Sequence, residues 1–91
     1  MTHTTREKQK LINRVRRIRG QMEGIERMLD EEKGCVEVMQ SIAGARGAMN
    51  GLMGEVIEDH IRMHLAAEGL TQKERDEGAA ELIDVVRAYL K

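Results

Sequence analysis

The sequence predicts an all-α protein with three helices, and three observations support this prediction. The 91 residues contain no proline, so no residue lacks the N–H that a helical hydrogen-bond ladder needs. Charged residues make up 34% of the chain and most of them favour helices. Apolar residues recur at alternating intervals of three and four, which is the period of a helix rather than of a strand. The length allows one small domain, residues 1–91.

The first predicted helix begins at Thr4, which forms the pattern of a capping box with Glu7. Its apolar residues are spaced 4-3-4-3-4, a heptad seam typical of helices that pack against other helices. They are Leu11, Val15, Ile18, Met22, Ile25 and Leu29. The segment 30–34, which is acidic and ends in glycine, terminates this helix.

The second predicted helix runs from about Cys35 to the mid-sixties and has the same spacing. Its seam consists of Val38, Ile42, Ala45, Met49, Leu52 and Val56. Four glycines also follow one stripe of this helix, namely Gly44, Gly47, Gly51 and Gly54. Because each glycine costs a helix about 1 kcal/mol, the stripe favours a face on which another helix packs closely. The alternative is a broken or poorly ordered helix.

The third predicted helix begins at Thr71, shortly after Gly69, and again has an acid three residues on, Glu74. It is expected to bury its apolar residues, Leu82, Val85, Val86, Tyr89 and Leu90. Three helices with so small a core cannot bury their seams alone. The sequence therefore predicts an obligate oligomer of helical hairpins.

Charge is distributed unevenly along the chain. The net charge is −1, yet the segment from Arg6 to Arg19 carries seven basic residues and one acid, so the remainder sums to about −7. The guanidinium group suits phosphate, which favours DNA binding over a merely solvated helix end. No helix-turn-helix spacing is present, so the contact would use a broad basic surface and read DNA shape. The candidate residues are Lys10, Arg14, Arg16, Arg17 and Arg19, with Arg46 added because of its charge.

A pair of histidines indicates half of a metal site. His60 and His64 are four residues apart and so share one face of the second helix. Cys35, the single cysteine, precedes His60 by 25 residues, about 37 Å along a helix, whereas metal bonds span about 2.0–2.3 Å. One protomer therefore cannot complete the site, but an antiparallel neighbour can. The alternatives are an inert cysteine and a solvated histidine pair.

Other classes of protein are disfavoured. The sequence has no apparent signal peptide and no apolar run of membrane length, which predicts a cytoplasmic protein. It has neither a phosphate-binding glycine loop nor a set of residues suited to nucleophilic catalysis, so an enzyme is not expected.

Three stretches resemble the CsoR/RcnR/FrmR family of small helical bacterial repressors. They are "RVRRIRGQMEGIERML", "CVEVMQSIAGARGAMNGLMGEVIEDHI" and "VVRAYLK". The resemblance implies a dimer of antiparallel helical hairpins, paired into a tetramer, that binds a GC-rich inverted-repeat operator and releases it when an inducer binds. It also implies that Arg14 and Arg17 contact the operator.

Four positions distinguish the branches of this family, and this chain has His3, Cys35, His60 and His64 there. The combination resembles the nickel/cobalt-responsive branch (RcnR- and DmeR-like). The copper branch would have cysteine in place of His64, and the formaldehyde branch would have an acid there and proline in place of Thr2. The resemblance thus implies Ni(II) or Co(II) as inducer, with Zn(II) binding in vitro. Loss of Met1 would leave the Thr2 amine beside His3 as a further ligand.

Two other functions compete with this one. The first is a formaldehyde-responsive repressor in which Cys35 reacts covalently and His60 assists. The second is a metal-buffering or structural helical oligomer without a DNA function, against which the basic segment Arg6–Arg19 argues.

Overall fold

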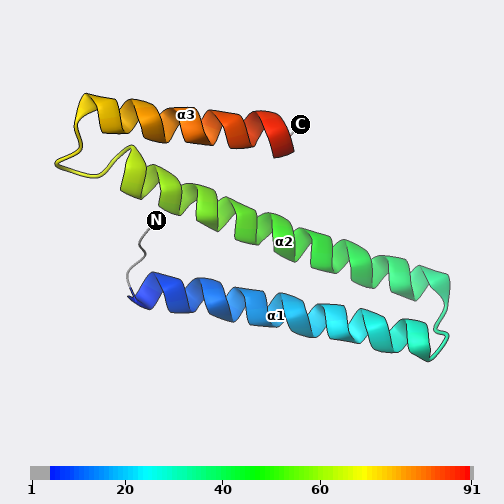
Figure 1. Ribbon diagram of the computed structural model, residues 1–91. Helices are drawn as coiled ribbons and strands as arrows, with labels where there is room; N and C mark the ends of the chain where they lie inside the picture. Colours follow the sequence, from blue (N-terminus) through cyan, green and yellow to red (C-terminus); the bar gives the residue numbers. More distant parts are fainter. Residues whose placement is uncertain (1–4, 91) are drawn as a thin grey trace. The chain divides into compact units, whose positions relative to one another are not determined.

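The computed structural model describes residues 5–90 and contains three helices (Figure 1). They are α1 (Thr5–Asp30), α2 (Cys35–His64) and α3 (Gln72–Tyr89). The described residues form no β-strand, so the predicted all-α class is confirmed. The predicted cap Thr4 lies outside the described residues. Because α2 is one uninterrupted helix of 30 residues, the alternative that its glycines break it is wrong.

Described residues 5–54 form a compact helical hairpin of α1 and most of α2 (Figure 1). The backbone hydrogen bonds that close the end of α1 include one from Glu31 N to the Arg27 carbonyl (2.8 Å) and one from Lys33 N to the Met28 carbonyl (2.9 Å). Glu32 takes a left-handed conformation with φ of 57°. This tight turn pairs carbonyls that the helix end would otherwise leave without a partner, and it reverses the chain.

Only two of the six residues in each predicted seam are buried. The buried apolar side chains are Ile18 and Ile25 on α1 and Val38 and Ala45 on α2, which lie seven residues apart on each helix. The seam residues between them remain exposed, for example Met22 (55%) on α1. The other exposed members are Val15, Leu29, Ile42 and Met49. The described chain therefore leaves an apolar stripe on each helix, made of large exposed side chains that recur every seven residues.

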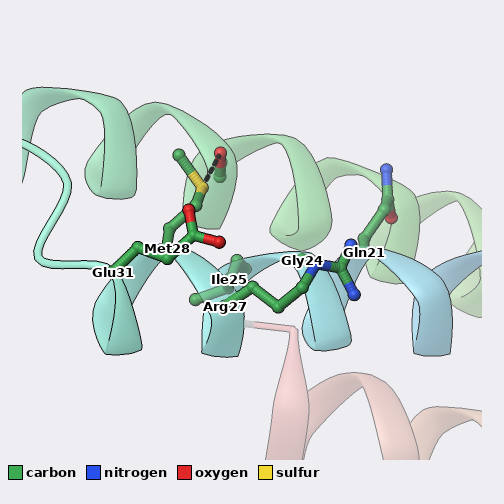
Figure 2. A pocket seen from close by; sticks show the side chains of 7 residues that line it. Gln21, Gly24, Ile25, Arg27, Met28 and Glu31 are labelled. Carbon is green, nitrogen blue, oxygen red and sulfur yellow. Dashed lines mark hydrogen bonds between the residues drawn. The ribbon is translucent and has the colours of Figure 1, made fainter.

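A polar contact joins the two helices near the turn of the hairpin. The Ser41 hydroxyl on α2 donates a hydrogen bond to the Met28 sulfur on α1 at 3.2 Å, drawn as a dashed line in Figure 2. Beside it lies an open hollow of about 400 Å³. Its lining consists of Gln21, Gly24, Ile25, Arg27, Met28, Glu31 and Ser41, so it contains none of the predicted metal ligands.

Described residues 55–90 form a second compact unit, made of the end of α2, a short loop and α3. The loop contains Gly69 with φ of 81°, a left-handed conformation that glycine adopts without strain. The predicted capping box at the start of α3 is confirmed. The Glu74 amide donates to the Thr71 hydroxyl at 3.1 Å, and the Thr71 amide donates to the Glu74 carboxylate at 2.9 Å.

The apolar side of α3 differs from the prediction. Among the residues of α3, only Gly78 is buried. Leu82 and Val85 are half-buried, while Tyr89 is 75% exposed. Val86 and Leu90 are exposed as well. The prediction of a buried apolar face was wrong for the single chain, because the described part of α3 packs through a glycine in its first half and its later apolar side chains stay exposed or half-buried.

Candidate metal centre and DNA-binding surface

His60 and His64 lie on successive turns at the end of α2. Their ring centroids are 4.7 Å apart and the ring planes are tilted by 35°. Both residues are half-buried. The predicted i, i+4 pairing is therefore present, and the two imidazoles are close enough to bind one ion together.

The His60 ring is hydrogen-bonded to the main chain of α3. Its Nε2 lies 2.9 Å from the carbonyl oxygen of Gly78. Because a carbonyl only accepts hydrogen bonds, Nε2 must be the donor. Neutral His60 then carries its proton on Nε2 and keeps the lone pair of Nδ1. Nδ1 is thus the atom of His60 that this arrangement leaves for a metal ion.

The first half of α3 packs directly against the segment that holds the histidines. A Cβ atom added at Gly78 would lie 2.9 Å from the Cβ of His64 and 3.1 Å from its carbonyl carbon. The Arg75 Nε donates to the Leu65 carbonyl at 3.3 Å, which places a cation at the C-terminal end of α2, where it is favourable. Gly78 and Arg75 were absent from the predicted site. A lone glycine inside a helix was the one sequence signal for the first of them.

Cys35 is the first residue of α2 and its thiol is exposed. It lies 25 residues before His60 in one continuous helix, about 37 Å at 1.5 Å per residue. Among the described residues, no group of three or more ligating side chains comes together. Thr2 and His3 lie outside the described residues. The histidine pair alone could supply two nitrogen donors to a metal ion, and the part of the chain that the structure describes adds no third ligand beside them.

The predicted DNA-binding residues fall into two groups. Five of them are exposed: Lys10, Arg16, Arg17, Arg19 and Arg46. Arg14 is half-buried instead, with its guanidinium directed at α2. A Cβ added at Gly51 would lie 2.5 Å from the Arg14 Nη1, so this glycine leaves the room that the arginine occupies. Sequence reasoning did not connect these two residues.

A helical hairpin with a cationic first helix and a pair of histidines able to bind a metal ion is typical of one class of protein, the small helical DNA-binding regulators. Residues 7–88 match the model of the metal-sensitive transcriptional repressor family. The chain belongs to that family, which is the CsoR/RcnR/FrmR family that the sequence resembles. Its members are transcriptional regulators, so the expectation that the chain is not an enzyme agrees with the family.

Two relatives match over the full length of both chains. An uncharacterized protein encoded in the bioA 5′ region of Serratia marcescens is 48% identical over 91 residues. A homolog of the transcriptional repressor RcnR from Escherichia coli is 43% identical over 91 residues. The second relative supports repression of transcription as the general activity of this chain.

Two solved structures share the fold. A glutamate-to-histidine variant of the formaldehyde-responsive regulator FrmR from Salmonella enterica serovar Typhimurium is 42% identical, with a TM-score of 0.89 over 97% of this chain and 99% of its own. The copper-sensing repressor CsoR from Geobacillus thermodenitrificans, solved with Cu(I), gives a TM-score of 0.89 at 22% identity, over 100% of this chain and 94% of its own. At that identity the copper sensor supports the fold alone.

Among the described residues, no helix has the length and apolar character needed to cross a bilayer. Because the family consists of repressors, a metal-buffering or purely structural role without DNA is disfavoured.

Proposed function

We propose that this chain represses a metal-efflux gene by binding its operator, and that Ni(II) or Co(II) binding releases the DNA. The observation that carries the proposal is the histidine pair of α2, whose rings lie 4.7 Å apart in a member of the metal-sensitive repressor family. Imidazoles with a single thiolate suit Ni(II) and Co(II) better than Cu(I), which prefers sulfur, while Zn(II) would also bind in vitro. The identity to an RcnR homolog agrees with this branch.

The complete site is proposed to lie between protomers. Cys35 of one protomer would join His60 and His64 of an antiparallel second protomer, with His3 and the Thr2 amine as further ligands. The continuity of α2 supports this arrangement, because one unbroken helix cannot return its first residue to its last two turns. A two-fold axis then creates two equivalent sites per dimer.

Assembly is supported by the apolar stripes of the hairpin. Val15, Met22 and Leu29 on α1 are between 49% and 61% exposed, although their type and spacing suit a helix–helix interface. We propose that two copies cover these stripes, that residues 1–91 act as one domain, and that dimers pair into tetramers in the cytoplasm. The exposed basic residues of α1, together with Arg46, would then form a broad surface for a GC-rich inverted-repeat operator.

The residues of the chain have separate roles in the proposed response. Arg17 and the other exposed basic residues of α1 bind phosphate. The half-buried Arg14 instead lies between α1 and α2, with its guanidinium beside Gly51. His60 and His64 of one protomer and Cys35 of another would hold the metal ion, and its bonds to them would link the two protomers. A dimer so joined fits DNA less well. A coupling of about 1–3 kcal/mol corresponds to a loss of operator affinity of roughly 5- to 150-fold.

A cobalt titration tests the site. Co(II) added to the purified protein should produce a thiolate-to-cobalt charge-transfer band that saturates at about one ion per protomer, since each dimer has two sites. Cys35→Ser should lose that band while keeping weaker binding through the histidines. A wild-type spectrum without any charge-transfer band would contradict Cys35 as a ligand.

A second candidate function is formaldehyde sensing, and the 42% identity to a FrmR variant favours keeping it. The exposed Cys35 thiol would add to the aldehyde carbon, with the thiol proton passing to the aldehyde oxygen. Mass spectrometry of the protein after formaldehyde treatment would show this adduct on Cys35, together with loss of operator binding. Release by cobalt but not by formaldehyde would exclude this candidate.

A further inference from the structure

We infer that Gly78 is a positioning residue for the histidine pair. It acts in two ways: it has no side chain to keep α3 away from α2, and its carbonyl oxygen binds the His60 ring. The missing side chain lets α3 approach His64 closely, and the carbonyl then holds the His60 ring by its Nε2 proton. The consequence for a bound metal rests on the proposed function, whereas the consequence for the His60 ring does not.

The packing at Gly78 is unusually close. A Cβ at this position would meet the Cβ and the backbone of His64 at 2.9 and 3.1 Å, and its carbonyl oxygen more closely still. These atoms belong to the helix, so they cannot move aside as the end of a flexible side chain can. Alanine here would force α3 away from α2. By contrast, the close neighbour of Gly51 is only the guanidinium end of Arg14.

Glycine at position 78 also opposes the local preference of the sequence. It lies inside α3, where glycine is about 1 kcal/mol less favourable than alanine, and it is the buried residue of that helix. The next two positions, Ala79 and Ala80, hold alanine, the small residue that a helix prefers. The close approach to His64 offers a physical reason for glycine at this position.

The hydrogen bond of His60 depends on this approach. At 2.9 Å the Nε2 to carbonyl distance is that of a normal N–H···O bond, and a shift of α3 by more than about 0.6 Å would take it past the 3.5 Å at which such a bond is lost. A ring without this bond can turn and can carry its proton on either nitrogen. Loss of an outer partner of this kind typically lowers metal affinity about 10- to 100-fold.

The first arm of the test uses the metal-free, full-length protein labelled with ¹⁵N. Imidazole nitrogen spectra are recorded about two pH units above the usual histidine pKa of about 6.5, with His60 assigned by comparison with His60→Gln. The wild type should show His60 protonated at Nε2, with that proton exchanging slowly with solvent. Gly78→Ala should lose the slow exchange. Gly20→Ala is the matched control, because a Cβ there meets nothing within 4 Å.

The second arm measures the cobalt affinity of the wild type, Gly78→Ala and Gly20→Ala. Gly78→Ala should bind Co(II) about 10- to 100-fold more weakly than the wild type, with an altered charge-transfer band, while Gly20→Ala should match the wild type. Unchanged exchange and unchanged affinity in Gly78→Ala would overturn the inference.

The two arms separate the possible failures. If Gly78→Ala does not fold, as judged by its circular dichroism, the wild-type spectrum decides: a slowly exchanging Nε2 proton supports the inference, and a proton on Nδ1 or rapid exchange overturns it. If the wild type binds neither Co(II) nor Ni(II), the proposed function fails, while the metal-free spectra still decide the role of Gly78.

Discussion

At the scale of single residues, His64 is the position at which metal preference should be most easily changed. It supplies an imidazole beside His60, and its neighbour Gly78 leaves it half-buried rather than solvated. If His64 and Cys35 bind the metal as proposed, replacing the His64 nitrogen with sulfur would give the site a second thiolate, which favours Cu(I) over Co(II).

We therefore expect His64→Cys to raise Cu(I) affinity by roughly tenfold or more, about 1.4 kcal/mol, and to strengthen the cobalt charge-transfer band. Competition with a chromogenic Cu(I) chelator measures the first effect and absorption spectroscopy the second. Glu58→Gln serves as the control, since Glu58 pairs with Arg62 on the exposed side of α2. An unchanged Cu(I) affinity would argue against His64 as a ligand.

Arginine side chains on α1 should differ in what they contribute to DNA binding. Arg17 is exposed and available to phosphate, whereas Arg14 is half-buried against α2 at Gly51. Arg17→Ala should weaken operator binding and lower the slope of log affinity against log salt by about 1 per lost phosphate contact.

Fluorescence anisotropy at several salt concentrations measures both effects. Arg87→Ala, which removes an exposed arginine from α3, is the matched control and should leave the slope unchanged. Equal slopes for Arg17→Ala and the wild type would mean that Arg17 contacts no phosphate.

At the scale of elements, the capping box gives the start of α3 a definite pH dependence. The hydrogen bond from the Thr71 backbone amide, followed by that of the Thr71 hydroxyl, lowers the pKa of Glu74 below its ordinary value of 4.5. Desolvation raises this pKa, but by less. Because the unfolded chain binds the proton more tightly, the stabilisation is fully present above about pH 4.5 and is lost as pH falls through the folded-state pKa.

Urea denaturation between about pH 3 and 6 should therefore show stability rising with pH in the wild type, and less steeply in Glu74→Gln. Glu77→Gln removes a neighbouring exposed carboxylate of α3 and controls for overall charge. Identical pH profiles for Glu74→Gln and the wild type would contradict the cap.

Sequence patterns predicted the elements better than their packing. The start of α2 at Cys35 and the cap of α3 follow from local chemistry, which acts within a few residues and can be read directly. The heptad spacing marks an apolar stripe but not which neighbour covers it, so it could not show that Ile18 is buried while Met22 is exposed. Gly78 was missed for the same reason, because its role depends on contact with another helix.

At the scale of the whole molecule, an intersubunit site should be recoverable by mixing defective chains. Cys35→Ser and His60→Ala should each lack the cobalt charge-transfer band. A mixed antiparallel dimer regains one site, in which the intact Cys35 of one chain meets the intact His60 of the other. Random mixing makes about half of the dimers mixed, so about one quarter of the wild-type sites should return.

The mixture is prepared by denaturing and refolding both variants together, with mass spectrometry to confirm mixed assemblies. Refolding each variant alone is the control and should give no band. Confirmed mixed dimers without any recovered band would show that the thiolate and the histidine do not come from different chains.

Operator binding during a cobalt titration tests the central claim most directly. The DNA upstream of the gene for this protein is labelled, and its affinity for the protein is measured by anisotropy while the charge-transfer band reports metal occupancy of the same sample. We expect affinity to fall roughly 5- to 150-fold as the band saturates, and Cys35→Ser to show a much smaller loss. Operator affinity that stays constant while cobalt fills the thiolate site would contradict the account.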